Sequence, residues 1–258
     1  MFQNIKNIYQ YREMLKSNVK KDLRGKYKGS FLGFLWTFIN PLLQLLVYSI
    51  VFSQVLKANV ENYPMFLFVA LIPWTFFTTA IQCATVEVVN NGAIIKKVYF
   101  PREILTLSTV TSAFVNFLLS MIIVVIALII SGIGISKYIL LFPLIAIINY
   151  VLTLGIGFIL SSVTVYLRDL EYIVNVFIML LFYLTPILYT LDSFPAEYKN
   201  ILMLNPMATI ILAYKDILYY QVMPNMWNLC VVGVLSVIVL FVGYLIFKKL
   251  ERKFAEEL

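Results

Sequence analysis

The stretch I-L-T-L-S-T-V-T-S-A-F-V-N-F-L-L-S-M-I-I-V-V-I-A-L-I-I-S, Ile104–Ser131, contains no acidic residue, no basic residue and no histidine. It exceeds the roughly 20 residues that a helix needs to cross a bilayer. Because a backbone in lipid must satisfy its own hydrogen bonds, the stretch predicts a transmembrane helix. Five further stretches share this lack of charge: Phe31–Leu56, Pro64–Val86, Tyr138–Tyr166, Ile173–Thr190 and Asn228–Phe247. We therefore expect an all-α integral membrane protein with six transmembrane helices.

The composition leaves room for one transmembrane domain over residues 1–258, since 62% of the chain is hydrophobic. Charge-free spans argue against an ion- or proton-driven carrier, which needs ionisable groups inside the membrane. The absence of histidine excludes histidine-based catalysis and histidine metal sites, and no G-x-x-x-x-G-K-[ST] phosphate loop occurs. No paired-carboxylate cluster is present either. The sequence thus predicts a chain that is not an enzyme and holds no cofactor or metal.

The basic residues predict the orientation in the membrane. One side of the six-span topology receives the N-terminal tail, the loops after the second and fourth spans, and the C-terminal end. That side holds 16 of the 20 Lys and Arg residues. The positive-inside rule places it, with both termini, in the cytoplasm. The net charge of +7 then reflects topology and attraction to anionic lipid rather than nucleic-acid binding.

Polar and aromatic residues form one stripe on the first predicted span. Asn40, Gln44 and Tyr48 recur every four residues, and Phe52 continues the stripe one turn later. Asn and Gln are costly against lipid, so the stripe should face protein or a water-filled path. Hydrogen bonding between helices is the alternative interpretation.

Small residues recur at intervals of four on two other spans. Ser108, Ser112, Asn116 and Ser120 do so on the third span, and Gly157 and Ser161 on the fourth, beside Gly155 and Ser162. Such residues allow helix backbones to approach closely, so both sets predict helix packing.

Three connecting segments have recognisable patterns. The basic, amphipathic tail (residues 1–30) predicts a helix lying in the headgroup plane. The loop after the second span predicts a turn at Asn91-Gly92 and a short helix from Ile94 to Phe100, which Pro101 ends. The external segment 191–227 contains an apolar run, Ile210–Tyr220, too short to span, which predicts re-entrant or interfacial helices around Asn205-Pro206.

The junction between the tail and the first span reads D-L-R-G-K-Y-K-G-S-F-L-G-F-L-W-T-F-I-N-P-L, Asp22–Leu42. It resembles type-2 ATP-binding-cassette permeases that export lipid-linked polysaccharides, in which a basic–Tyr–basic cluster is followed by Ser, Leu-Gly, Leu-Trp and Pro-Leu. Three later motifs agree in order: K-V-Y-F-P-R-E-I-L (Lys97–Leu105), Y-L-R-D-L (Tyr166–Leu170), and T-P-I-L-Y followed by N-P-M. The resemblance covers essentially the whole chain.

This resemblance implies an exporter that moves an undecaprenyl-linked glycan (O-antigen, capsule or teichoic acid) across a bacterial inner membrane. The chain would pair with a second copy of itself and bind two separate ATPase subunits, which would hold the ATP and Mg. The tail would be an interface helix, and Ser193–Val222 would form external gate helices.

The resemblance also assigns roles to individual residues. The cytoplasmic coupling helix that contacts the ATPase would comprise Asn91, Gly92, Lys96, Lys97, Tyr99, Phe100, Pro101 and Arg102. Spans one and five would line the substrate path, with Asn40, Gln44, Tyr48 and Phe52 facing Phe182, Tyr183 and Tyr189. Arg24, Lys26 and Lys28 would lie at the entrance for the lipid diphosphate.

Two alternatives to the polysaccharide exporter follow from the same residues. Within the fold, the chain would be a type-2 permease for a drug or another lipid, and the aromatic stripe would be ordinary core. In another class, it would be a membrane enzyme of polyprenyl-lipid metabolism, which the missing histidine and acidic clusters disfavour.

Overall fold

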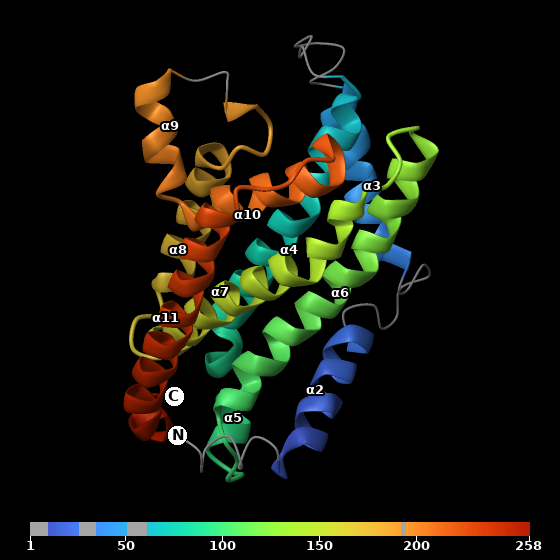
Figure 1. Ribbon diagram of the computed structural model, residues 1–258. Coiled ribbons are helices and arrows are strands. Elements are labelled where there is room, and N and C mark those ends of the chain that lie inside the picture. The colour runs from blue at the N-terminus through green and yellow to red at the C-terminus, as the bar shows by residue number, and fades with distance from the viewer. Residues whose placement is uncertain (1–9, 26–34, 51–60, 192–194) are drawn as a thin grey trace.

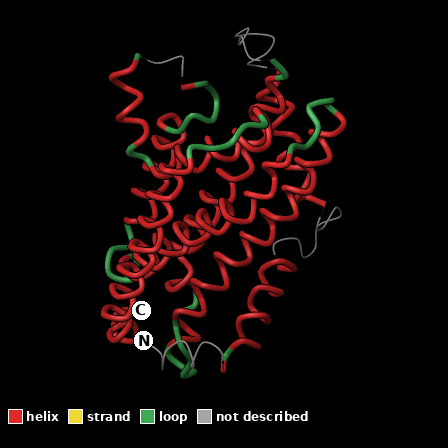
Figure 2. The backbone as a smooth tube through the Cα atoms, in the orientation of Figure 1, coloured by secondary structure: helices red, strands yellow, loops and turns green. Residues whose placement is uncertain are grey.

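The computed structural model describes residues 10–25, 35–50, 61–191 and 195–258, and within these ranges every regular element is helical. Figure 1 shows a bundle of long helices. Figure 2 shows that short loops join most of them. The α-helices in chain order are α2 (Arg12–Gly25), α3 (Trp36–Ser49), α4 (Tyr63–Asn90), α5 (Gly92–Ile95), α6 (Glu103–Ile130), α7 (Phe142–Val163), α8 (Leu170–Leu184), α9 (Ala196–Met203), α10 (Pro206–Lys215), α11 (Met226–Leu250) and α12 (Phe254–Glu257). Three shorter segments lie between them: the 3₁₀ helices η3 (Lys137–Leu141) and η6 (Glu251–Lys253), and the π-helix η5 (Asp216–Tyr220).

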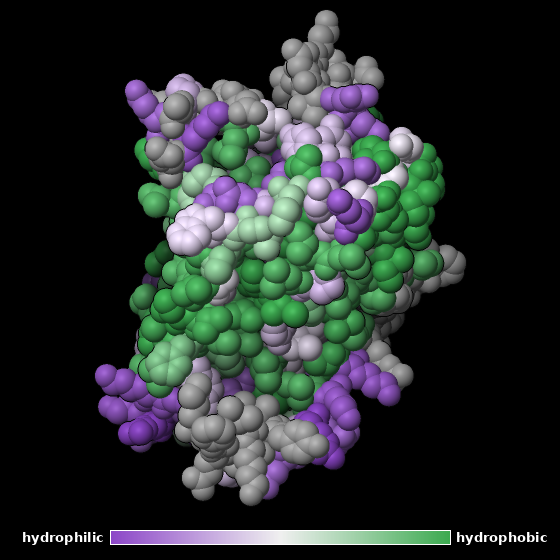
Figure 3. All heavy atoms as spheres, in the orientation of Figure 1, coloured by the Kyte–Doolittle hydropathy of each residue, from purple (hydrophilic) through white to green (hydrophobic). Residues whose placement is uncertain are grey.

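Four helical segments of the described chain are long and apolar enough to cross a membrane. They are Tyr63–Asn90, Glu103–Ile130, Lys137–Val163 and Met226–Glu257. They correspond to the second, third, fourth and sixth expected spans. Figure 3 shows an apolar band around the middle of the visible face, with hydrophilic residues gathered at its two ends. The chain is thus a multi-pass membrane protein.

The fifth expected span is a shorter helix than the sequence predicts, and the first is described only in part. Helix α3 contains 14 residues, and the continuation of that expected span beyond Ile50 lies outside the described residues. Helix α8 contains 15 residues and ends at Leu184 instead of reaching Thr190. Pro186 explains this end, since the residue before a proline is driven out of the helical region. Thr185 accordingly has φ −106° and ψ 134°.

Helix α4 lies at the centre of the bundle. It contacts α6, α7, α3, α8 and α10, and most of its side chains are buried. Its sequence is apolar on all sides, as expected for a helix with neighbours all round. The other helices are arranged around this axis (Figure 1).

Helices α7 and α11 form the closest helix pair. A Cβ added to Gly155 would lie 2.6 Å from the backbone N of Leu240, and one added to Gly243 would collide with the backbone O of Gly155. Only glycine permits this approach, which increases van der Waals contact between helices in a bilayer. Gly155 thus has the packing function that the sequence predicts for small residues on this span, and its partner is Gly243.

Candidate functional site

The turn between α4 and α6 forms one end of the bundle, called here the α5 end (Figure 1). Asn91 ends α4, and its side-chain Nδ2 donates to the backbone O of Glu87 at 2.8 Å and to Glu87 Oε1 at 2.7 Å. The chain then re-enters a helix at once, as α5. The helix expected from Ile94 to Phe100 therefore starts earlier, at Gly92, and ends at Ile95. The Asn91-Gly92 turn is so tight that α5 follows α4 directly.

The α5 end presents a mixed apolar and basic surface. Ile94, Lys96, Lys97, Val98 and Tyr99 are all exposed, and Tyr99 is 94% exposed. We call these five residues the α5 surface. Two of the other residues in this loop, Ile95 and Phe100, are buried in the core. Phe100 therefore anchors the loop, whereas Tyr99 is the aromatic residue available to a partner.

The C-terminal residues brace the α5 surface from behind. A Cβ added to Gly92 would contact the Leu258 side chain at 3.4 Å. Arg102 donates to the backbone O of Glu251, and its guanidinium lies 5.8 Å from the centre of the Phe254 ring. Pro101 and Arg102 are half-buried. Arg102 thus joins the loop to the C-terminal turn.

A buried ion-pair network lies beside this brace. Lys248 Nζ lies 2.8 Å from Glu103 Oε1 and 2.9 Å from Glu251 Oε1. The Glu103 side chain is 1% exposed. The network joins the start of α6 to the end of α11. Sequence reasoning missed it, because the two segments are far apart in the chain and each charged residue looks like part of a solvated end.

The residues expected to line the path belong to two different parts of the chain, the first span with α3 and the end of α8 with the segment after it. On α3, Asn40 is exposed; Gln44 and Tyr48 belong to the helix, but their side chains and all of Phe52 lie outside the described residues. The main contacts of α3 are to α4 and α6, whereas α8 contacts α4. Within the described residues of one copy, α3 and α8 each contact α4 but are not major neighbours of one another.

The three aromatic residues at the end of α8 differ in their surroundings. The Phe182 ring packs against the rings of Trp74, at 5.9 Å, and Tyr183, at 5.5 Å. Tyr183 is 65% exposed. Tyr189 donates from its hydroxyl to the backbone O of Tyr183 at 2.8 Å and folds the segment after Pro186 back on α8.

The residues expected at the lipid-diphosphate entrance are described only in part. Arg24 lies in the last turn of α2, and Lys26 and Lys28 lie outside the described residues. Helix α2 packs along the α5-end half of α6, and its exposed face includes Arg12, Lys16 and Lys20. This arrangement agrees with the amphipathic character that the sequence predicts.

The opposite end of the bundle contains α9 and α10 (Figure 1). Asn205 separates these two helices: its Oδ1 accepts from the backbone N of Met207 at 3.0 Å, which caps α10. The Asn205 Nδ2 donates to Thr185 Oγ1 at 2.9 Å. The Asn205-Pro206 signal in the sequence thus marks a helix start and also a contact with the end of α8.

Lys215, the last residue of α10, is buried next to the same break in α8. Its Nζ donates to the backbone O of Pro186 at 2.6 Å and of Ile187 at 3.0 Å. It also lies 3.4 Å from the centre of the Phe66 ring. Burial lowers the pKa of Lys215, while the two carbonyls and the ring favour its charged form. Sequence reasoning gave this lysine no such role, because Pro186 lies almost 30 positions earlier.

Comparison with known proteins supports this architecture over the whole chain. Residues 13–219 match the family model described as ABC-2 type transporter. The O-antigen export system permease protein RfbA of Myxococcus xanthus is 35% identical over 260 residues, covering 100% of both chains. A protein of the same name from Klebsiella pneumoniae is 36% identical over 245 residues, covering 95% of this chain and 94% of the other.

These matches run through both ends of the bundle and agree with the order of motifs in the sequence. The family model alone covers most of the chain, from α2 to η5. The chain belongs to the ABC-2 type transporter family.

Proposed function

We propose that the chain is the transmembrane subunit of an ATP-driven exporter that moves a lipid-linked polysaccharide out of the cytoplasm. The observation that carries this proposal is the end-to-end similarity, at about 35% identity, to permeases named for O-antigen export. The family match alone would also suit a type-2 permease for a drug or another lipid, but the three similar permeases are all named for O-antigen export. The cargo class is an undecaprenyl-linked glycan such as O-antigen, capsule or teichoic acid.

In this proposal the chain crosses a bacterial inner membrane six times. Helices α3 and α8 supply the first and fifth spans, beside the four longer ones. At about 1.5 Å per residue α8 is roughly 22 Å long, shorter than the ~30 Å hydrocarbon core, so the segment after Pro186 completes the crossing in contact with α10. The α5 end faces the cytoplasm with both termini, because the basic residues gather there.

The α5 surface is the docking site for the partner ATPase in this proposal. Its basic and apolar residues are exposed around Tyr99, and buried Phe100 fixes their position. Exposed aromatic residues surrounded by polar ones are typical of protein interfaces. ATP and Mg bind to the partner, whose movement reaches α4 and α6 directly through this turn.

Two copies of the chain form the permease. Both α3 and α8 present exposed large apolar residues, and in this proposal pairing with a second copy places α3 of one copy near α8 of the other. Asn40, Gln44, Tyr48 and Phe52 would then face Phe182, Tyr183 and Tyr189 across a shared path. Aromatic faces stack on the C–H surfaces of sugar rings, and amides bond the hydroxyls.

The basic residues at the end of α2 and directly after it in the sequence provide the entrance in this proposal. Arg24, Lys26 and Lys28 would attract the diphosphate of the lipid carrier at the cytoplasmic surface, where basic clusters bind anionic headgroups. The exposed basic face of α2 extends this positive surface.

The test is co-purification of the detergent-solubilised chain, expressed with its neighbouring genes. We expect a roughly equimolar ATPase, and ATP turnover that is lost when the ATPase is removed. In cells that lack the chain, the lipid-linked glycan should accumulate on the cytoplasmic side. Two results together would contradict the proposal. The chain would purify without an ATPase, and cells that lack the chain would carry an unchanged surface glycan.

A further inference from the structure

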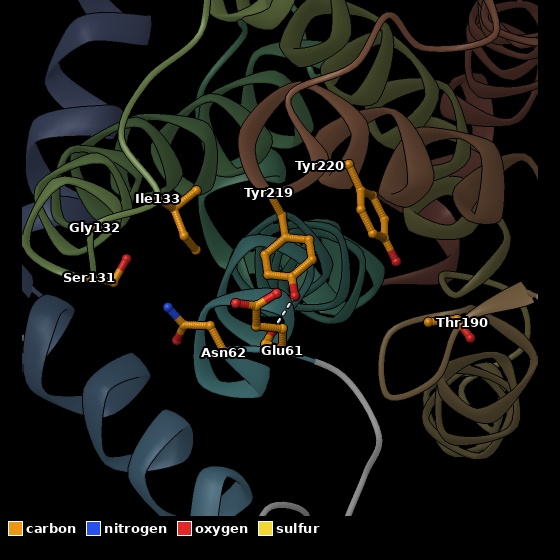
Figure 4. A pocket seen from close by; sticks show the side chains of 8 residues that line it. All are labelled: Glu61, Asn62, Ser131, Gly132, Ile133, Thr190, Tyr219 and Tyr220. Carbon is orange, nitrogen blue, oxygen red and sulfur yellow. Dashed lines mark hydrogen bonds between the residues drawn. The ribbon is translucent and has the colours of Figure 1, made fainter.

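A pocket of about 640 Å³ lies at the end of the bundle opposite α5. Three loop ends form it: the residues that begin α4 (Glu61 and Asn62), the turn after α6 (Ser131–Ile133), and the end of η5 (Tyr219 and Tyr220). Thr190, which follows the broken end of α8, completes the lining. Figure 4 shows the Glu61 side chain beside the Tyr219 ring, with Ser131 on one side and Tyr220 and Thr190 on the other. The volume lies within the range of small-molecule sites.

The lining combines one carboxylate, one amide and several hydroxyls with two aromatic rings. The Tyr219 and Tyr220 rings lie 4.9 Å apart at 80°, so they present differently oriented faces. Tyr220 is 44% exposed. Carboxylate and amide groups bond pairs of hydroxyls, and an aromatic face accepts the C–H surface of a ring. This combination suits a neutral, hydroxyl-rich ring.

Other ligand classes fit the lining less well. Among the described residues that line the pocket none is Lys or Arg, so this part of the lining offers an anion no charged partner. Glu61 is the one carboxylate in the lining, and Ca²⁺ or Mg²⁺ sites in proteins use more oxygen ligands. An acyl chain would leave the amide and hydroxyl groups without partners.

Contacts behind the pocket hold its wall in place. Tyr219 donates from its hydroxyl to the backbone O of Glu61, and its ring packs edge-on against Phe66 at 5.5 Å. Gln221 Nε2 donates to the backbone O of Ile133 at 2.7 Å. The end of η5 is therefore bonded to each of the other two loop ends. A site whose wall is fixed before binding loses less entropy when a ligand binds.

Left-handed backbone conformations gather at the same place. Within the described part of the chain, positive φ occurs at Asn62 (48°), Gln221 (57°), Gly132 (83°) and Gly134 (78°). Asn62 and Gly132 line the pocket, and the other two are neighbours of lining residues. For residues other than glycine this conformation costs of order 1 kcal/mol or more and concentrates at functional sites. The amide of Asn62 makes no capping bond to α4, so helix capping does not explain it.

We infer that this pocket is a carbohydrate-binding site on the outer face, which holds sugar rings of the exported glycan as they leave the permease. The inference rests on the proposed function for its orientation and for the glycan. The rings of Tyr219 and Tyr220 stack on the sugar, and Glu61 and Asn62 bond its hydroxyls. The site lies against Phe66 of the central helix α4, whose other end leads into α5.

The test measures binding to the full complex with its ATPase in lipid nanodiscs. The probe is the polysaccharide that mild acid releases from the producing strain, with dextran as the comparison sugar. We expect saturable binding of the strain's own polysaccharide and at least ten-fold weaker binding of dextran. Equal binding of the two would mean that the site does not belong to the exported glycan and would overturn the inference.

Variants separate stacking from hydrogen bonding. Tyr220→Ala should weaken binding about five- to ten-fold, as loss of an aromatic contact does, and Tyr220→Phe should stay within about two-fold. Glu61→Gln should weaken binding about five-fold, because a neutral acceptor is weaker than a charged one. Trp227→Ala is the matched control: Trp227 is 77% exposed at the same end but does not line the pocket, so binding should not change.

The results distinguish failure of this inference from failure of the proposed function. If the complex forms and exports glycan normally, but Tyr220→Ala and Glu61→Gln bind polysaccharide like the wild type, the pocket is not the site. If no ATPase co-purifies and no glycan is exported, the proposed function fails first. Unfolding temperatures measured for each variant show whether weaker binding reflects a loss of fold.

Discussion

Each end of the bundle contains a lysine that bonds inside the protein, fully buried at Lys215 and partly buried at Lys248, and the two charges are stabilised in different ways. At the α5 end, Lys248 lies between the carboxylates of Glu103 and Glu251. At the opposite end, Lys215 is held by the backbone carbonyls of Pro186 and Ile187 and by the Phe66 ring. The first arrangement is an ion-pair network. In the second, the charge interacts with carbonyl dipoles of the segment after α8 and with an aromatic ring.

This difference determines what each lysine does for its surroundings. Lys248 neutralises charges that would otherwise repel each other inside the protein. Lys215 donates to the carbonyls of Pro186 and Ile187, which lie beyond the end of α8 at Leu184 and outside its ladder of hydrogen bonds. Opposite charges therefore hold the α5 end together. At the other end, Lys215 is held by the carbonyls of the short segment after α8, at Pro186 and Ile187.

Replacing Lys248 with Met should have the largest effect on stability. It leaves the buried carboxylate of Glu103 without a counter-charge, and breaking a buried pair in this way costs about 3–5 kcal/mol. We expect a much lower unfolding temperature of the detergent-solubilised chain, measured by intrinsic fluorescence.

The double variant Glu103→Gln with Lys248→Met is the control for this interpretation. It removes both charges and should recover part of the lost stability, because no uncompensated charge remains. If the double variant is less stable than Lys248→Met alone, the charge interpretation of the network is wrong.

Replacing Lys215 with Met should have a smaller effect, of about 1–3 kcal/mol. The carbonyls of Pro186 and Ile187 lose a donor, but a buried charge is removed, and the neighbouring carboxyl of Asp216 is less buried than that of Glu103. The same measurement of unfolding temperature checks it. Lys215→Arg keeps the charge and the donors and should lose less. A loss for Lys215→Met that equals the loss for Lys248→Met would remove the distinction between the two ends.

The pH dependence sharpens the comparison at Asp216, next to Lys215. Burial raises the pKa of Asp216 to about 6, and the charge of Lys215 opposes the rise. Because the folded-state pKa lies above the unfolded value, this carboxyl stabilises the fold at low pH, and the contribution is lost as pH rises through about 6.

We therefore expect Asp216→Asn to remove this contribution to the change in unfolding temperature between pH 4 and pH 7. Asp216 is half-buried, so solvent screening reduces its share to about 1 kcal/mol, or about 2–4 °C. Identical pH profiles for the variant and the wild type would show that Asp216 does not titrate in this range.

Local sequence patterns predict the parts of this fold that depend on local physics. The charge-free stretches identify the helices because lipid demands a bonded backbone, and Asn205-Pro206 predicts a helix start. The end of α8 also has a local signal, Thr185-Pro186. The predicted span nevertheless continued to Thr190, because its bounds were set by the absence of charged residues.

The contacts between distant segments could not be predicted in the same way. Nothing near Glu103 in the sequence indicates that Lys248 is its partner, and nothing near Lys215 points to Pro186. The pocket around Glu61 and Tyr220 could not be predicted for the same reason, because loops that are far apart in the sequence form it. The central position of α4 follows only from packing, since its sequence is no more apolar than that of the other spans.

Replacing Tyr99 with Ala should have the smallest effect on stability and a large effect on assembly. Tyr99 is 94% exposed, so its loss should change the free energy of unfolding by less than about 0.5 kcal/mol. If the α5 surface binds the ATPase, however, an exposed aromatic residue at its centre should contribute strongly to binding. We expect much less ATPase to co-purify with Tyr99→Ala, at an unchanged unfolding temperature.

The matched control is Tyr172→Ala, which removes another exposed tyrosine, 71% exposed and outside the α5 surface, at the start of α8. It should bind the ATPase like the wild type. Phe100→Ala gives the opposite pattern, because Phe100 is buried: its loss should lower the unfolding temperature as well as ATPase binding. If Tyr99→Ala retains the ATPase while Phe100→Ala loses it only by unfolding, the α5 surface is not the docking site. The exposed residues of the α5 surface would then have no role in assembly, while buried Phe100 and the ion pairs of Lys248 would still hold the turn in place.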